Sequence, residues 1–262
     1  MKIAVAQLTC APGEPEANLL KVRDFCQRAS RAGAALIVFP EMIDTGYSMS
    51  VIAKQAGSWT TGFVPALRET AREYSIAIVA GVSEREPEAI YNSQVFIDRQ
   101  GRIAAKYRKT HLYAVAPVEE QSCFAAGNSF VSVAFGDLRF GLTICYDLRF
   151  PELYRKLVTQ DDVSAFIVSS AWPFPRDEHL RVLAAARAIE NQSYLISSNR
   201  VGRDGDLWFC GGSAVIDPRG VVIAAASADR EELIHAELSP ELVRSVRDRV
   251  KSLAHRRTDL YQ

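Results

Sequence analysis

Three chemically active side chains stand at or near the ends of apolar, strand-like runs. Cys145 follows RFGLTI and precedes YDLRFPE, Glu41 ends ALIVFPE, and Lys109 lies in AAKYRKTHLY. A thiol with the ordinary cysteine pKa of about 8.5 is mostly protonated at neutral pH, so a cysteine nucleophile needs a base. A carboxylate can take that proton, an ammonium can stabilise an oxyanion, and the thiolate can attack a carbonyl or nitrile carbon. Singly, each residue fits a structural or solvated role, but together they predict a nucleophilic site.

Histidine is the more usual partner of a catalytic cysteine, and the chain has four histidines. His235 alternates within a strand-like segment and His255 lies in a basic C-terminal segment, which favours structural or solvated roles for both. His111 and His179 stay open as the base of a Cys–His acyltransferase or thiol protease. In such an enzyme, replacing those histidines would abolish activity and Glu41→Gln would retain it.

The other four cysteines are weaker candidates for a nucleophile. Cys26 lies on the apolar face of a predicted helix, and Cys10 ends the first predicted strand. Cys123 and Cys210 fall in loop-like segments without notable neighbouring charges. Cys145 differs from all of them because it follows an apolar strand, and ligands of α/β proteins bind at the carboxyl ends of strands.

The elements that must position these residues alternate between strands and amphipathic helices. Helices are predicted around residues 22–29, after Pro65, from Pro151, and over 178–191, where Val182, Ala185, Ala186 and Ile189 share one face. Ser239 and Pro240 are typical of an N-cap and a first helical position. The predicted strands cover residues 2–9, 35–41, 76–84, 92–98, 103–109, 129–136, 139–147, 164–170, 193–200, 211–217, 221–227 and 232–238.

This order of elements predicts an α/β protein in which two sheets pack together with helices outside, a four-layer α-β-β-α sandwich. The chain has 262 residues, 48% of them hydrophobic, which suits one large core. No linker or low-complexity segment interrupts it. We therefore expect a single domain over 1–262.

The charge balance and the cysteine count exclude several classes of function. The 31 Lys and Arg residues equal the 31 Asp and Glu residues and are interspersed with them, so nucleic acid and membrane partners are not expected. No apolar run approaches the roughly 18 residues of a membrane span. Five cysteines without C-x-x-C spacing favour neither disulfides nor a zinc site. We expect a reduced, cytoplasmic protein with no metal and no cofactor.

Three segments closely resemble the signature segments of the nitrilase superfamily, the carbon–nitrogen hydrolases. They are FPEM at 39–42, YRKTHLY at 107–113 and ICYDLRFPE at 144–152, and their order and spacing also match. The likeness continues through 187–202, 209–220 and RRTDLY at 256–261. The resemblance implies the α-β-β-α sandwich, a Glu41–Lys109–Cys145 triad and a homodimer or larger homo-oligomer.

The superfamily also has a second glutamate between its lysine and its cysteine. Two adjacent residues, Glu119 and Glu120, are candidates in YAVAPVEEQSCFAAGNSF. Their spacing to Gly127 favours Glu120, which the resemblance places beside Lys109.

The segments CYDLRFPELYR and WPFPR, residues 172–176, look most like the small nitrilase-like amidases that cleave terminal amides of carboxylate-bearing metabolites. Arg176 is then expected to pair with a substrate carboxylate, with Tyr47 and Trp172 lining the pocket and Tyr146 donating a backbone N–H to the oxyanion. Arg149 is expected to pack the loop after the nucleophile. An N-carbamoyl hydrolase, a nitrilase and an inactive ligand-binding relative remain alternatives, although a tyrosine after the cysteine disfavours the nitrilase.

Overall fold

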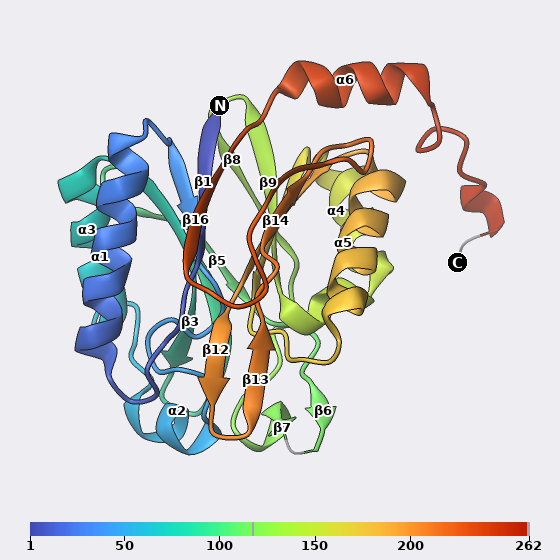
Figure 1. Cartoon of the computed structure of the whole chain (residues 1–262). Helices are drawn as coiled ribbons and strands as arrows, with labels where there is room; N and C mark the ends of the chain where they lie inside the picture. The colour runs from blue at the N-terminus through green and yellow to red at the C-terminus, as the bar shows by residue number, and fades with distance from the viewer. Residues whose placement is uncertain (117, 261–262) are drawn as a thin grey trace.

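Within the residues that it describes, 1–116 and 118–260, the computed structural model has two six-stranded sheets packed face to face (Figure 1). Tyr261, the last residue of the RRTDLY segment, lies outside the described residues. The first sheet has the order β16 (Glu232–Glu237), β1 (Lys2–Gln7), β2 (Leu36–Val38), β3 (Ala77–Arg85), β4 (Ile90–Ile97), β5 (Ile103–Arg108). The second has the order β15 (Val222–Ala225), β14 (Ala214–Ile216), β11 (Tyr194–Asn199), β10 (Ala165–Ser170), β9 (Leu138–Ile144), β8 (Val131–Phe135).

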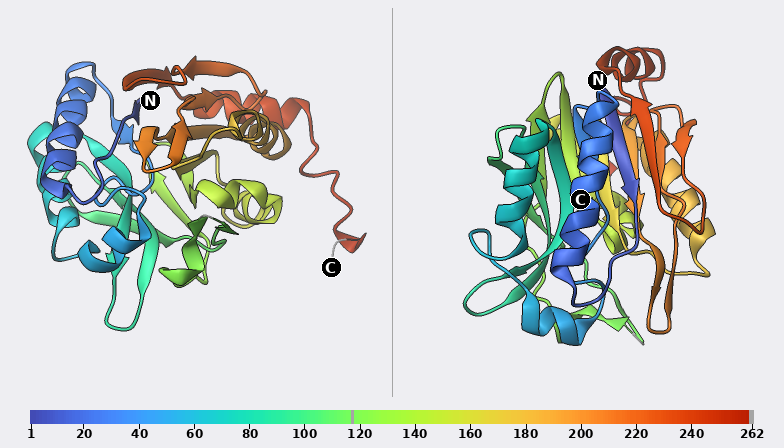
Figure 2. Two further views of the ribbon diagram at one scale, coloured as in Figure 1. Left: turned by 60° about the horizontal axis from the view of Figure 1, so that its bottom comes forward. Right: turned by 60° about the vertical axis from the view of Figure 1, so that its left-hand side comes forward.

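Helices cover the outer face of each sheet, as Figures 1 and 2 show. The first sheet carries α1 (Pro15–Arg31) and α3 (Phe63–Tyr74), and the second carries α4 (Pro151–Asp161) and α5 (Asp177–Asn191). The predicted apolar face of α1 is buried against its sheet. A larger apolar cluster fills the space between the sheets and continues under α4 and α5. The predicted four-layer sandwich is confirmed.

Strand direction brings the candidate residues to one edge of the sandwich. β1, β2 and β3 are parallel, and so are β9, β10 and β11. β4 pairs antiparallel with both β3 and β5, so β5 runs in the same direction as β3. The segments after β2, β5, β9 and β10 therefore emerge at the same end, where side chains from distant parts of the sequence can meet.

The sequence predicts which residues of α5 share a face, and the structure shows which face of the helix is buried. Val182 and Ile189 do share a face, but they are 48% and 53% exposed. The buried face instead contains Leu180, Ala184 and Ala188. Both faces carry apolar residues, so the 3.6-residue period shows which residues lie together without showing which face meets the sheet.

The strand expected over 35–41 is shorter in the structure, because β2 ends at Val38.

Several short elements at the end of the sandwich where the candidate residues lie were not predicted. The helix α2 (Met49–Gln55), the hairpin of β12 (Val201–Asp204) and β13 (Leu207–Cys210), and the pair β6 (Ala114–Val115) and β7 (Val118–Glu119) lie together at the lower end in Figure 1. The loop assignment of Cys210 is wrong, because this residue is buried at the end of β13. These segments are short and irregular, so they carry little periodic signal.

The C-terminal part of the chain starts with the predicted capped helix. In α6 (Pro240–Arg249), the Ser239 hydroxyl accepts a hydrogen bond from the Leu242 N–H at 3.3 Å. The described part of the chain then projects away from the sandwich as far as the short helix η3 (Thr258–Leu260), as Figure 2 shows. No helix among the described residues is long and apolar enough to span a bilayer.

Candidate active site

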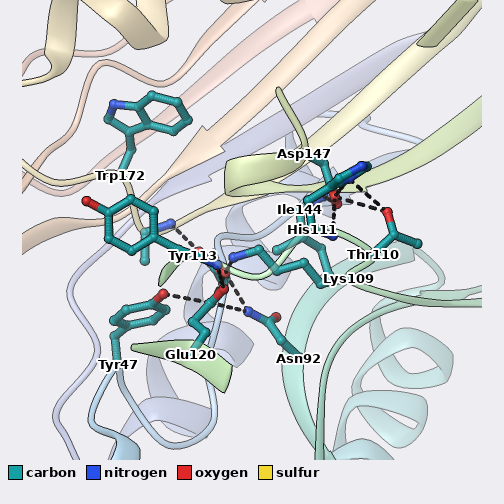
Figure 3. Close-up of polar contacts among 12 residues, drawn as sticks. Tyr47, Asn92, Lys109, Thr110, His111, Tyr113, Glu120, Ile144, Asp147 and Trp172 are labelled. Atoms are coloured by element: carbon teal, nitrogen blue, oxygen red, sulfur yellow. Dashed lines mark hydrogen bonds and ion pairs between the residues drawn. The ribbon is translucent and has the colours of Figure 1, made fainter. Parts of the chain in front are cut away.

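The centre of the site is a buried cluster of two carboxylates and one ammonium (Figure 3). Lys109 Nζ lies 3.0 Å from Glu41 Oε1 and 2.8 Å from Glu120 Oε1, and all three side chains are fully buried. A buried charge is costly unless it is paired and hydrogen-bonded. The mutual pairing, together with hydrogen bonds from neighbouring groups, makes this arrangement possible in the protein interior.

Glu41 is held by residues of three other segments, which are Lys109 after β5, Ala171 after β10 and Asn92 in β4. The backbone turns out of the first sheet after β2, which brings the side chain toward the second sheet. Its Oε2 atom accepts a hydrogen bond from the Ala171 N–H at 2.8 Å, just beyond β10. The Asn92 side-chain amide donates to Glu41 Oε1 at 2.6 Å and to Glu120 Oε1 at 3.1 Å. Asn92 was missed in the sequence, although a buried-strand pattern containing polar NSQ is a usable signal.

Glu120 begins the short helix η1 (Glu120–Ser122), and its carboxylate accepts several hydrogen bonds. Besides Lys109 and Asn92, it accepts from the Tyr47 hydroxyl at 2.7 Å and from the Tyr113 N–H at 2.7 Å. Glu119, the other candidate for the second glutamate, is exposed on β7. The geometry therefore favours Glu120.

Cys145 follows β9 and begins the helix η2 (Cys145–Arg149) with a φ of 44°, in the left-handed region. A non-glycine residue in this region is strained by about 1–3 kcal/mol, and such strain collects at functional sites. Burial, reinforced by the negative charge of Glu41, raises the pKa of the Cys145 thiol, while Lys109 and the Ser170 hydroxyl act in the opposite direction. The resting thiol is therefore protonated, and a nearby base has to remove its proton.

Burial also raises the pKa of the Glu41 carboxyl. The ammonium of Lys109 opposes this shift, but it is shared with Glu120, whose negative charge raises the pKa of Glu41 further. A carboxylate with a raised pKa is a stronger base than an ordinary one. Glu41 is thus suited by its surroundings to accept a proton from the neighbouring thiol.

Cys145 opens into a pocket at this end of the sandwich. The four residues predicted to contact substrate, Tyr47, Tyr146, Trp172 and Arg176, all line it. Arg149, which we expected to pack the loop, also lines the pocket, together with Tyr113, Val118, Leu207 and Phe209.

The two arginines are the cationic groups of this mostly apolar pocket. The Arg149 guanidinium lies 4.9 Å from the centroid of the Trp172 ring and donates to His179 Nδ1 at 3.2 Å. The Arg176 carbonyl oxygen accepts a hydrogen bond from Trp172 Nε1 at 2.8 Å. Over residues 1–116 and 118–260, neither guanidinium has a carboxylate partner. An anionic group of a ligand would supply one.

The two histidines considered as bases are engaged elsewhere. His111 Nδ1 lies 2.8 Å from Asp147 Oδ1, and its ring stacks on Phe150 at 3.8 Å between centroids. His179 Nδ1 contacts Arg149. Figure 3 shows His111 and Asp147 in a group separate from the Lys109 cluster. The geometry favours Glu41 over either histidine as the base.

Gly81 in β3 permits the close approach of the Glu41 backbone. A Cβ atom at Gly81 would lie 2.6 Å from Glu41 Cα and 2.8 Å from Pro40 O. We expect Gly81→Ala to shift Glu41, to lower the free energy of unfolding by about 1–3 kcal/mol and to reduce kcat by at least about ten-fold. Chemical denaturation and steady-state kinetics measure the two effects.

Gly141→Ala is the matched control for Gly81→Ala. Its Cβ would lie 2.7 Å from the Phe166 ring, away from Glu41, so it should reduce stability and leave kcat within about two-fold. Equal kcat losses in the two variants would contradict a specific role for the space at Gly81.

The four-layer sandwich, with a cysteine beside a buried Glu–Lys–Glu cluster at its strand ends, defines the nitrilase-like class of hydrolases. Residues 2–248 match the family model described as carbon-nitrogen hydrolase. The chain belongs to this family and is an enzyme of this class. The resemblance in the three signature segments is therefore confirmed.

Curated relatives and solved structures agree with this assignment. The chain is 32% identical over 260 residues to the 2-oxoglutaramate amidase of Bacillus subtilis, covering 99% of this chain and 98% of that protein. It is 33% identical over 267 residues to the deaminated glutathione amidase of Synechocystis sp., covering 97% of each. An amidase from Nesterenkonia sp. AN1, solved as a mutant after Michael addition of acrylamide at its active-site cysteine, matches with 29% identity and a TM-score of 0.89, covering 100% of this chain and 98% of that chain.

Proposed function

We propose that this enzyme hydrolyses the terminal amide of a small molecule that also carries a carboxylate, and releases ammonia and a carboxylic acid. One observation carries the proposal: Cys145, beside the buried Glu41–Lys109 pair, opens into the same pocket as two guanidiniums that have no carboxylate partner among the described residues. The cysteine and its cluster suit attack on the amide carbon, and the arginines suit the distant carboxylate. The amidase names of the similar proteins support this choice of bond.

The proposed reaction starts when Glu41 takes the thiol proton of Cys145. The thiolate attacks the amide carbon, and the oxyanion of the tetrahedral intermediate is stabilised by Lys109 and the Tyr146 N–H. Glu41 returns the proton to the leaving nitrogen and the C–N bond breaks. Ammonia departs, and the acyl group remains on Cys145 as a thioester. Glu41 then activates a water molecule, which hydrolyses the thioester. Acid–base assistance is worth about 10²–10⁴-fold and one oxyanion donor about 10²–10³-fold.

Glu120 has a supporting role in this scheme. Its contacts with Lys109 and the Tyr47 hydroxyl support a function in holding the ammonium at the oxyanion position. Lys109 then remains charged, since burial favours the neutral amine but the two carboxylates raise the pKa of Lys109 above its usual value. A permanently charged donor stabilises the developing negative charge without proton transfer.

The arginines are proposed to set substrate preference. We expect Arg176→Gln and Arg149→Gln each to raise KM about 10–100-fold for an amide that bears a distal carboxylate, because a charge-assisted hydrogen bond is lost. The same changes should alter KM for a neutral amide of equal length by less than about three-fold. Arg203→Gln, on the exposed part of β12, is the control. Equal losses on both amides would contradict charge recognition.

A substrate panel tests the proposed function itself. The protein is incubated with terminal amides of small acids, N-carbamoyl amines and nitriles, and ammonia and carbon dioxide are measured. Ammonia from the amides alone is the expected result. Carbon dioxide would indicate the N-carbamoyl hydrolase, turnover of nitriles would indicate the nitrilase, and no product from any compound would favour the inactive ligand-binding relative.

The quaternary state and the compartment are further parts of the proposal. The exposed apolar residues of α5 and of 221–223 in and before β15 support association of two copies through the α5 face. Sedimentation at twice the chain mass of 28.9 kDa would agree, and a monomer at micromolar concentration would not. All five cysteines are free thiols, which supports a reduced, cytoplasmic location.

A further inference from the structure

Asp147 connects the two segments that carry Cys145 and Lys109. It lies in η2, two residues after Cys145, and its side chain is fully buried. Its Oδ2 atom accepts hydrogen bonds from the Ile144 N–H at 3.0 Å and the Tyr107 hydroxyl at 2.7 Å. Its Oδ1 atom accepts from His111, both from the backbone N–H at 3.1 Å and from Nδ1 at 2.8 Å.

The contacts span both sides of the catalytic pair. Ile144 immediately precedes Cys145, whereas Tyr107 and His111 lie two residues before and after Lys109. The Thr110 hydroxyl adds a further hydrogen bond to Oδ1 at 3.2 Å. Figure 3 shows this second polar group beside the Lys109 cluster. One carboxylate thereby ties the turn of the nucleophile to the segment of the lysine.

Only a carboxylate fits this position. Each of its oxygens faces a backbone N–H, which can donate and cannot accept. An asparagine would have to direct its NH₂ group at one of these N–H groups in either orientation. Among the described residues, His111 is the one side chain in ion-pair distance of this buried carboxylate, and stacking on Phe150 fixes the plane of its ring.

We infer that Asp147 and His111 form a brace that holds Cys145 in its left-handed conformation and at a fixed position relative to Lys109. A strained backbone persists only where its surroundings over-determine it, and the hydrogen bond from the Ile144 N–H to Asp147 closes the turn around Cys145. His111 is then a positioning residue and not the base. The inference rests on the proposed roles of Cys145 and Lys109 and is independent of which amide is cleaved.

Replacing His111 tests the brace. His111→Ala should lower kcat about 10–100-fold, because a misplacement of a reacting group by about 1 Å can cost about 10²-fold. KM should change less than about two-fold, because the ring does not line the pocket. His111→Asn places an amide donor near the position of Nδ1 and should restore kcat to within about five-fold of the parent. His255→Ala, in the exposed C-terminal segment, should have no effect.

A double substitution tests whether the two residues act as one unit. Asp147→Asn should lower kcat at least as much as His111→Ala, and the double variant should be no worse than Asp147→Asn alone, since coupled residues are not additive. Three outcomes would each overturn the inference. They are a double variant whose loss of kcat is the product of the two single losses, a His111→Ala enzyme with kcat within two-fold of the parent, and a rise in KM without a fall in kcat. If Asp147→Asn does not fold, the kcat values of His111→Ala and His111→Asn still test the brace.

The failure of the brace can be separated from the failure of the proposed function. If Cys145→Ala is inactive and His111→Ala is fully active, only the brace is wrong. If Cys145→Ala still releases ammonia, the proposed chemistry is wrong whatever His111 does.

Discussion

Cys145→Ala should lower the rate of ammonia release by about 10⁴–10⁶-fold, the largest effect that we expect. The substitution removes the covalent route altogether, and losses of this size follow removal of the nucleophile in a triad hydrolase. Alanine fills less space than cysteine and leaves the pocket otherwise intact, so the affinity for substrate should change only a few-fold. Calorimetric binding, steady-state kinetics and mass spectrometry of trapped thioester together measure these outcomes.

Cys26→Ala is the matched control for the nucleophile. Cys26 in α1 is also buried, and burial likewise raises the pKa of its thiol. In the part of the chain that the structure describes, no carboxylate acts on this thiol, which faces the core between α1 and the first sheet. Its replacement should therefore leave kcat unchanged. Retained turnover in Cys145→Ala, or a thioester mapped to another cysteine, would show that the nucleophile has been wrongly assigned.

Glu41→Gln should have the second largest effect, a loss of about 10³–10⁴-fold in kcat. Glu41 is proposed to move a proton in the attack, in the departure of ammonia and in the hydrolysis of the thioester, and an amide can do none of these. The glutamine would also misalign Lys109, because only its carbonyl oxygen can accept, while the native carboxylate accepts from Lys109, Asn92 and the Ala171 N–H. Glu119 is the exposed neighbour of Glu120, so Glu119→Gln should leave kcat unchanged.

The pH dependence distinguishes loss of a base from loss of shape. Glu41 has to be ionised to act, and burial raises its pKa above the ordinary value. The fall of kcat/KM toward acid should therefore begin at a higher pH than for an ordinary carboxylate, with full activity above this limb and none well below it. In Glu41→Gln the limb should vanish from the residual rate. An unchanged limb, or a loss smaller than ten-fold, would direct attention back to His111 or His179.

The sequence by itself determined the class of fold and the residue types of the site. Apolar runs with period two or without polar interruption specify strands, and the 3.6-residue pattern specifies α1, α3 and α5. Cys145, Glu41 and Lys109 are recognisable because each breaks an apolar or strand-like run where that run ends. These signals are local, so they can be recognised without knowing which elements pack against each other.

Only the tertiary structure decided which of these residues meet and what surrounds them. Asn92 joins two carboxylates that are 79 positions apart, at 41 and 120, and Asp147 joins the turn of Cys145 to His111. The outward face of α5 and the place of Arg149 in the pocket were likewise beyond the sequence pattern. The physical reason is that hydrogen bonds and burial depend on contacts between segments, and the local period of a segment carries no information about its distant neighbours.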